Sequence, residues 1–119
     1  MENQIIYQKI KHGVNSEYVL AEKYYDILSV INDLNLTKRE IQLVAYVAVN
    51  NDVPYSVLRE EFCEKYGSTA PTINNIVSKL RKKFVLKKEK DKVDVNPVIF
   101  LNFKKNLKLE INFEHNETK

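Results

Sequence analysis

Hydrophobic residues recur every three or four positions between residues 20 and 48, which is the period of amphipathic helices. The first such stretch follows Ser16, a candidate N-cap, and its apolar positions are Leu20, Tyr24, Ile27, Leu28, Ile31 and Leu34. The apolar positions of the second are Ile41, Val44, Ala45 and Ala48, widened by Leu43 and Val47. We therefore predict two helices here that each bury one face.

Capping and turn residues mark helix ends and open two further helices. Residues 37–40 (TKRE) have the form of a capping box before the second helix, and 50–52 (NND) end it. A third helix opens at Pro54 and Ser56 and closes at Gly67, with apolar positions Val57, Leu58, Phe62 and Tyr66. A fourth is capped by Ser68 or Thr69 and has Pro71 in its first turn.

Alternating and β-branched stretches at both ends of the chain predict strands. A short strand is expected over residues 4–10, ended by His12-Gly13. After Lys83, residues 84–88 and 93–95 flank a polar turn at 89–92 and predict a β-hairpin. Two more strands are expected at 98–103 and 107–113, the latter alternating strictly. The expected order, β-α-α-α-α-β-β-β-β, is an α+β fold.

The composition narrows the class of protein. A chain of 119 residues with 44% hydrophobic and 29% charged residues is typical of one globular, soluble domain. Within it we distinguish an N-terminal strand and helix (1–35), a central part (36–101) and a C-terminal strand and tail (102–119). Cys63 is the sole cysteine, so no internal disulfide can form and a cytoplasmic location is expected. No stretch predicts a signal peptide or a membrane span.

Positive charge is concentrated in one part of the chain. Residues 79–92 contain eight Lys/Arg and two Asp/Glu, a net charge of +6, whereas the whole chain is only +3. A basic excess confined to one element indicates a surface for a polyanion. The alternative is a solvated surface, which is the usual role of a run of charges.

The third and fourth predicted helices form a helix-turn-helix, with the fourth as the helix that would enter a DNA groove. On a helical wheel, Ile73, Ile76, Val77 and Leu80 share the buried face. The opposite pole and its flanks carry amides, hydroxyls and cations, which can pair with base edges or phosphates. The candidate DNA-binding residues are Thr72, Asn74, Asn75, Ser78, Lys79, Arg81, Lys82, Lys87, Lys88, Lys90 and Lys92.

Residues 56–95 (SVLREEFCEKYGSTAPTINNIVSKLRKKFVLKKEKDKVDV) resemble the winged helix-turn-helix superfamily, and the resemblance extends over about 36–101. It implies a helical core with a C-terminal antiparallel hairpin or sheet. In that family the hairpin is a wing whose tip grips a groove or phosphates, which here implicates Lys87, Lys88, Lys90 and Lys92. The turn differs in lacking a glycine and in containing Glu89 and Asp91. Residues 36–40 (LTKRE) are also similar to the opening of LuxR-type helix-turn-helix regulators.

Little in the sequence indicates an enzyme, and no catalytic, cofactor or metal site is predicted. His12 and His115 lie far apart in expected loop or tail positions, and Cys63 is expected to be a small core residue. Glu60, Glu61 and Glu64 are expected to form a solvated face. Tyr18 and Tyr25 are candidates for an exposed protein-binding surface.

We therefore expect a protein that binds double-stranded DNA, specifically a bacterial or phage transcriptional regulator. The abundance of Asn, Lys and Ile fits an AT-rich genome of that kind. A homo-oligomer is expected because operators normally contain two half-sites, with the first helix or the C-terminal strands as the interface. The alternative is a protein-interaction module that forms a structural part of a larger assembly such as a phage virion, and no membrane partner is expected in either case.

Overall fold

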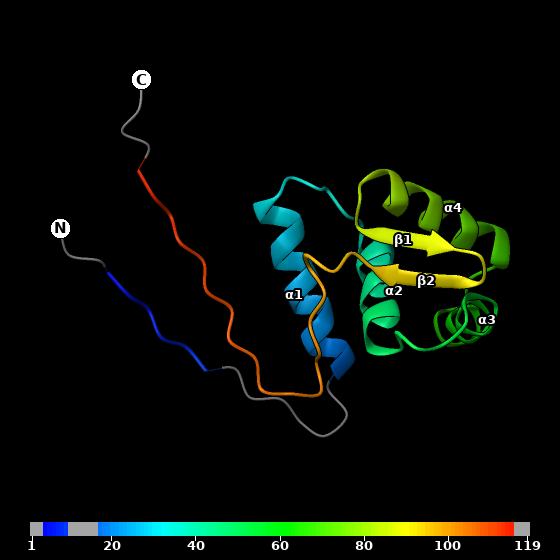
Figure 1. The fold of residues 1–119 in the computed structure, drawn as a ribbon, viewed down its shortest axis with the longest axis horizontal. Coiled ribbons are helices and arrows are strands. Elements are labelled where there is room, and N and C mark those ends of the chain that lie inside the picture. Colours follow the sequence, from blue (N-terminus) through cyan, green and yellow to red (C-terminus); the bar gives the residue numbers. More distant parts are fainter. Residues whose placement is uncertain (1–3, 10–16, 116–119) are drawn as a thin grey trace.

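The computed structural model describes residues 4–9 and 17–115. These contain four helices, α1 (Glu17–Ile31), α2 (Lys38–Val49), α3 (Tyr55–Tyr66) and α4 (Ala70–Lys82), followed by two strands, β1 (Leu86–Glu89) and β2 (Lys92–Val95) (Figure 1). The two strands form one antiparallel sheet. The expected α+β class is thus confirmed in this form, while the predicted cap Ser16 and the predicted strand end at 12–13 lie outside the described residues.

Helix α2 lies at the centre of the fold. It packs against α1 on one side and against β2 and α3 elsewhere, while α4 packs against α3 and β1. Leu43, Val44, Ala45 and Val47 are therefore fully buried, which confirms the wide apolar face predicted for this helix. Residues Leu58 and Phe62 of α3, and Ile73, Val77 and Leu80 of α4, complete the core beside it.

Local capping groups set the helix ends where the sequence predicts them. The Thr37 hydroxyl accepts the Glu40 N–H, and the Thr37 N–H donates to the Glu40 carboxylate at 2.7 Å, so the capping box is confirmed. The Thr69 hydroxyl accepts the Thr72 N–H at the start of α4. Gly67 ends α3 with a φ of +66°, in the left-handed region that favours glycine. Only residues 67–69 separate α3 from α4.

The hairpin begins two residues later than predicted, and each strand extends one residue further toward the turn. Phe84 precedes β1 with a φ of +61°, because it closes α4 through a hydrogen bond from its N–H to the Arg81 carbonyl, and the Val85 N–H bonds the Leu80 carbonyl. That left-handed residue delays the strand to Leu86. The ladder then pairs Leu86 with Val95 and Glu89 with Lys92, so the turn has two residues, Lys90 and Asp91, rather than four.

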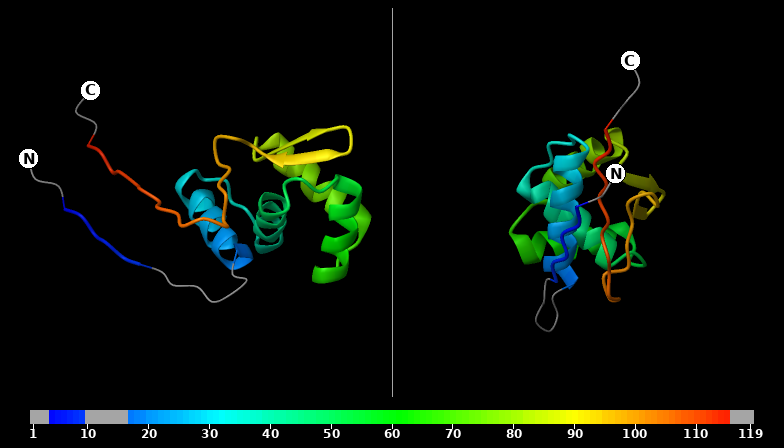
Figure 2. Two further views of the ribbon diagram at one scale, coloured as in Figure 1. Left: turned by 60° about the horizontal axis from the view of Figure 1, so that its bottom comes forward. Right: turned by 90° about the vertical axis from the view of Figure 1, so that its left-hand side faces the viewer.

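The other predicted strands are absent from the described residues. Residues 4–9 and 98–115 contain no strand, and both end segments extend away on the α1 side of the molecule (Figure 2). The alternating row Leu107, Leu109, Ile111 and Phe113 stays exposed in this single chain. An alternating pattern favours an extended segment with two different faces, but a strand also needs a neighbouring backbone to form hydrogen bonds with. The described part of the chain provides no such neighbour.

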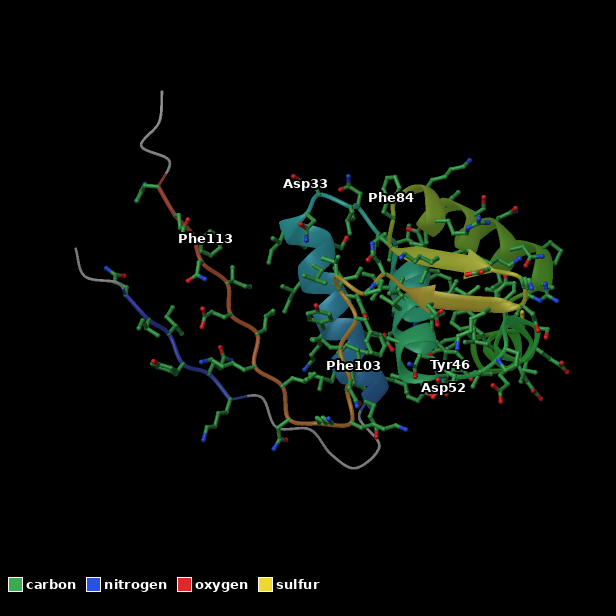
Figure 3. All side chains as sticks on the ribbon, viewed as in Figure 1. Asp33, Tyr46, Asp52, Phe84, Phe103 and Phe113 are labelled. Carbon is green, nitrogen blue, oxygen red and sulfur yellow. The ribbon has the colours of Figure 1, made fainter. Side chains whose placement is uncertain are left out.

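The prediction that Tyr25 is exposed is wrong, because Tyr25 is only 1% exposed. Residues 99–103 return across α1, where the Tyr25 hydroxyl donates to the Ile99 carbonyl at 3.1 Å and its ring packs edge-on against Phe103 (Figure 3). The buried stripe of α1 is therefore Ala21, Tyr25 and Ser29, and Ile27 and Ile31 are exposed instead of buried. Val57 is also exposed, and Ile76 is half-buried.

Candidate functional site

Helix α4 presents a row of polar side chains to solvent, which we call the outer row: Thr72, Asn75, Lys79 and Lys82. All four are exposed. The Thr72 hydroxyl oxygen accepts a hydrogen bond from the Thr69 hydroxyl at 2.9 Å. Within the described part of the chain, the side chains of Asn75, Lys79 and Lys82 have no hydrogen-bond or ion-pair partner. Their spacing of three and four residues places them on one face of the helix, where a partner could contact them together.

A second row on α4 lines an open cleft between α3, α4 and the hairpin. This cleft row consists of Asn74, Ser78 and Arg81. Each of the three comes one residue before a member of the outer row, so the two rows are adjacent on the helix. The polar lining also includes Tyr55 and Arg59 of α3, Lys88 of β1, and Asp91 of the hairpin turn. The cleft has a volume of about 320 Å³. The predicted residues of α4 are thus divided between two surfaces.

Asn74 is tied to α3 on the cleft side of α4. Its Oδ1 accepts hydrogen bonds from the Tyr55 hydroxyl at 2.6 Å and from Arg59 Nη1 at 3.1 Å. A bidentate contact with adenine needs that oxygen as an acceptor. Asn74 therefore has a structural engagement that competes with the base contact predicted for it, whereas Asn75 has none.

Two cations converge on the ring of Tyr55. The Arg59 guanidinium lies 5.3 Å and the Lys88 ammonium 5.4 Å from the ring centroid, within the range of cation–π attraction. Burial raises the pKa of Tyr55 above its ordinary value, against an opposing effect of Arg59. The hydroxyl is therefore protonated at neutral pH and acts as the donor to Asn74.

The hairpin turn is attached to the N-terminus of α3 through Asp91. The Asp91 carbonyl accepts the Tyr55 N–H at 2.8 Å, while its carboxylate oxygens accept the Ser56 N–H at 3.0 Å and the Ser56 hydroxyl at 2.8 Å. Pro54, the N-cap residue of α3, makes no side-chain cap bond. Asp91 thus serves as a cap supplied from 35 residues away, and it fixes the turn against α3.

Replacing this remote cap should destabilise the fold. We expect Asp91→Ala to lower the free energy of unfolding by about 1–2 kcal/mol, because helix N-cap carboxylates contribute that much. Asp91→Asn, which keeps one acceptor, should lose less. Urea unfolding followed by circular dichroism measures both, with Asp52→Ala as a control at an exposed aspartate. A loss in Asp91→Ala no larger than in the control would contradict the role of the cap.

The solvent face of the hairpin has no net charge. The register places Lys87 opposite Asp94 and Glu89 opposite Lys92, and Lys92 Nζ lies 4.0 Å from the Asp94 carboxylate. Lys88 is on the other face, toward the cleft, and Lys90 is exposed in the turn with a φ of +55°. The four lysines predicted to act together as a wing tip therefore lie in three different environments.

The remaining candidate residues do not line this cleft. Cys63 is half-buried, Glu60, Glu61 and Glu64 are exposed on α3, and His115 is exposed, while His12 lies outside the described residues. Tyr18 is half-buried and stacks on Tyr46 at 5.5 Å. Among residues 4–9 and 17–115, no group of three His, Cys, Asp or Glu is arranged to hold a metal ion. Each helix in those residues is too short or too polar to cross a lipid bilayer.

Three residues of the cleft region were missed by the sequence reading: Tyr55, Arg59 and Asp91. Arg59 lies beside the glutamates of the third helix, which were expected to form a solvated face. Asp91 was considered only because its negative charge reduces the positive charge of the predicted wing. The sequence offered one signal for Arg59, which is the scarcity of arginine, with only three in the chain. The structure alone places Arg59 and Arg81 at the same cleft. Comparison with family models, with curated proteins and with solved structures finds no match for the chain.

Proposed function

We propose that this chain is a winged helix-turn-helix protein that binds double-stranded DNA and acts as a bacterial or phage transcriptional regulator. The observation that carries the proposal is the outer row of α4, an exposed line of hydroxyl, amide and ammonium groups on the second helix of a closely joined pair. These are the groups that contact base edges and phosphates in a major groove. The adjoining hairpin follows α4 directly, as a wing would.

The outer row divides by chemistry into two roles. Asn75, with a free amide, is suited to pair with adenine, and Thr72 lies beside it nearer the helix N-terminus. Lys79 and Lys82 follow toward the C-terminus and would neutralise phosphates at the groove edge. Asn74 and Ser78, first expected at base edges, instead line the cleft. Base contact therefore falls mainly to the first turns of α4, where helix-turn-helix proteins place it.

A selection experiment tests whether Asn75 reads sequence. We expect the full chain to enrich a common motif from a randomised duplex pool and to bind it about 10-fold or more tighter than mixed-sequence duplex, since a bidentate pair is worth about 1–3 kcal/mol. Asn75→Ala should lose this preference and keep its affinity for mixed duplex, while the exposed control Asn106→Ala should keep both. No enrichment by the wild type, or an unchanged motif in Asn75→Ala, would contradict the role.

A second candidate function is a docking module in a larger protein assembly, and the end segments favour it. Residues 107–113 are extended, with Phe113 92% exposed, and residues 4–9 are extended with Ile6 90% exposed (Figures 2 and 3). Strands with unpaired backbone groups and an apolar row commonly complete a sheet with another chain. Val30 and Ile31 of α1 are exposed as well. These surfaces would serve equally for a homodimer.

A further inference from the structure

The cleft between α3, α4 and the hairpin has an excess of positive charge. Arg59, Arg81 and Lys88 line it, and the ion pairs within residues 4–9 and 17–115, Lys92–Asp94 and Lys108–Glu110, include none of the three. The one carboxylate in the lining, Asp91, has both oxygens engaged by Ser56. Three cations held near one another repel unless an anion joins them.

The cleft also offers hydrogen-bond donors and few free acceptors. The Asn74 oxygen is occupied by Tyr55 and Arg59, which leaves the amide N–H groups of Asn74 as donors. The Ser78 hydroxyl, also in the lining, has no hydrogen-bond partner within the described residues. Arginine forks pair with carboxylate and phosphate oxygens alike. Three cations and two neutral donors exceed what the two oxygens and single charge of a carboxylate can use, and they suit the greater charge and the additional oxygens of a phosphate.

Two of the three cations are positioned before any ligand arrives. Arg59 is held by Asn74 and by the Tyr55 ring, and Lys88 lies over the same ring. Asp91 fixes the turn that follows β1 against α3. A preorganised site loses less conformational entropy when it binds, which favours affinity. The volume, about 320 Å³, is at the lower end of the range for small-ligand sites and leaves ample room for a phosphate group.

We propose that this cleft binds a phosphate group through Arg59, Arg81 and Lys88. Where the bound phosphate belongs to the DNA backbone, this site extends the proposed function and rests on it, because the cleft row adjoins the outer row on α4. A free phosphate compound would use the same groups, and its binding would stand without DNA. Competition between duplex DNA and a free phosphate compound therefore decides which of the two sources the cleft binds.

The test uses the full chain with inorganic phosphate and pyrophosphate as probes, at an ionic strength held constant with sodium chloride. We expect both probes to shift the backbone amide resonances of residues 55–59, 74–81 and 88–91 and to raise the melting temperature. Arg81→Gln/Lys88→Gln should weaken pyrophosphate binding about 10-fold or more, because charge-assisted contacts are lost. Lys104→Gln/Lys105→Gln removes the same charge from residues that do not line the cleft and should change that affinity less than about 2-fold.

Adding duplex DNA separates the two sources. Displacement of pyrophosphate by duplex would identify the ligand as a backbone phosphate and support both proposals. Pyrophosphate binding in the cleft without any duplex binding would support the site and overturn the proposed DNA function. Equal pyrophosphate affinity in the wild type and Arg81→Gln/Lys88→Gln would overturn the site, whether or not the protein binds DNA.

Discussion

Phe62→Ala should lower the free energy of unfolding by about 3–5 kcal/mol, because removing a fully buried aromatic side chain leaves a cavity that the core cannot fill. Phe62 is 0% exposed and joins α3 to the central helix α2 through a ring contact with Tyr46 at 5.6 Å. Its ring also packs against Tyr66 of its own helix at 4.4 Å. Since a domain of this size is stable by about 5–15 kcal/mol, the variant would lose a large part of its stability. Urea unfolding monitored by circular dichroism measures the change.

Two further variants keep this prediction testable. Phe62→Leu should retain the fold with a smaller loss if Phe62→Ala does not fold at all. Val57→Ala is the control on the same helix, where the side chain is 46% exposed and the loss should be within about 0.5 kcal/mol. Equal losses for Phe62→Ala and Val57→Ala would contradict the assignment of Phe62 to the core.

Lys79→Glu/Lys82→Glu should weaken binding to mixed-sequence duplex about 100-fold or more at 50 mM salt. Both ammonium groups are in the exposed outer row of α4, and the substitution both removes two phosphate contacts and introduces repulsion. The slope of log affinity against log salt should fall by about 2, because each contact contributes about 0.9. Fluorescence anisotropy at several salt concentrations measures affinity and slope together.

Lys104→Glu/Lys105→Glu is the matched control for overall charge. It changes the net charge of +3 by the same four units, but both lysines lie in the turn at residues 103–105, on a segment away from α4 (Figure 1). Beyond about 10 Å, exposed charges are largely screened at 0.1 M salt, so this variant should keep most of its affinity. Equal losses in both variants would exclude α4 as the contact surface. If neither they nor the wild type binds duplex while the wild type sediments as a multimer, the assembly function takes precedence.

Local interactions explain why the helices could be predicted from the sequence. The Thr37–Glu40 capping box and the Thr69 cap each join groups three residues apart. Gly67 ends α3 through its own φ, and the apolar face of α2 follows from the helical period. None of these features depends on a distant partner, so residue type and spacing were sufficient to predict them.

The sequence by itself therefore determined four helices, the caps of α2 and α4, a hairpin and a concentration of positive charge near the C-terminal end of α4. The tertiary structure alone decided the burial of Tyr25 by residues 99–103, the docking of the hairpin turn through Asp91, and the meeting of Arg59, Arg81 and Lys88 at one cleft. Among residues 4–9 and 17–115, it also provides no strand partner for residues 107–113. The physical reason is distance along the chain: these features join groups separated by many residues, and pattern and propensity report only on near neighbours.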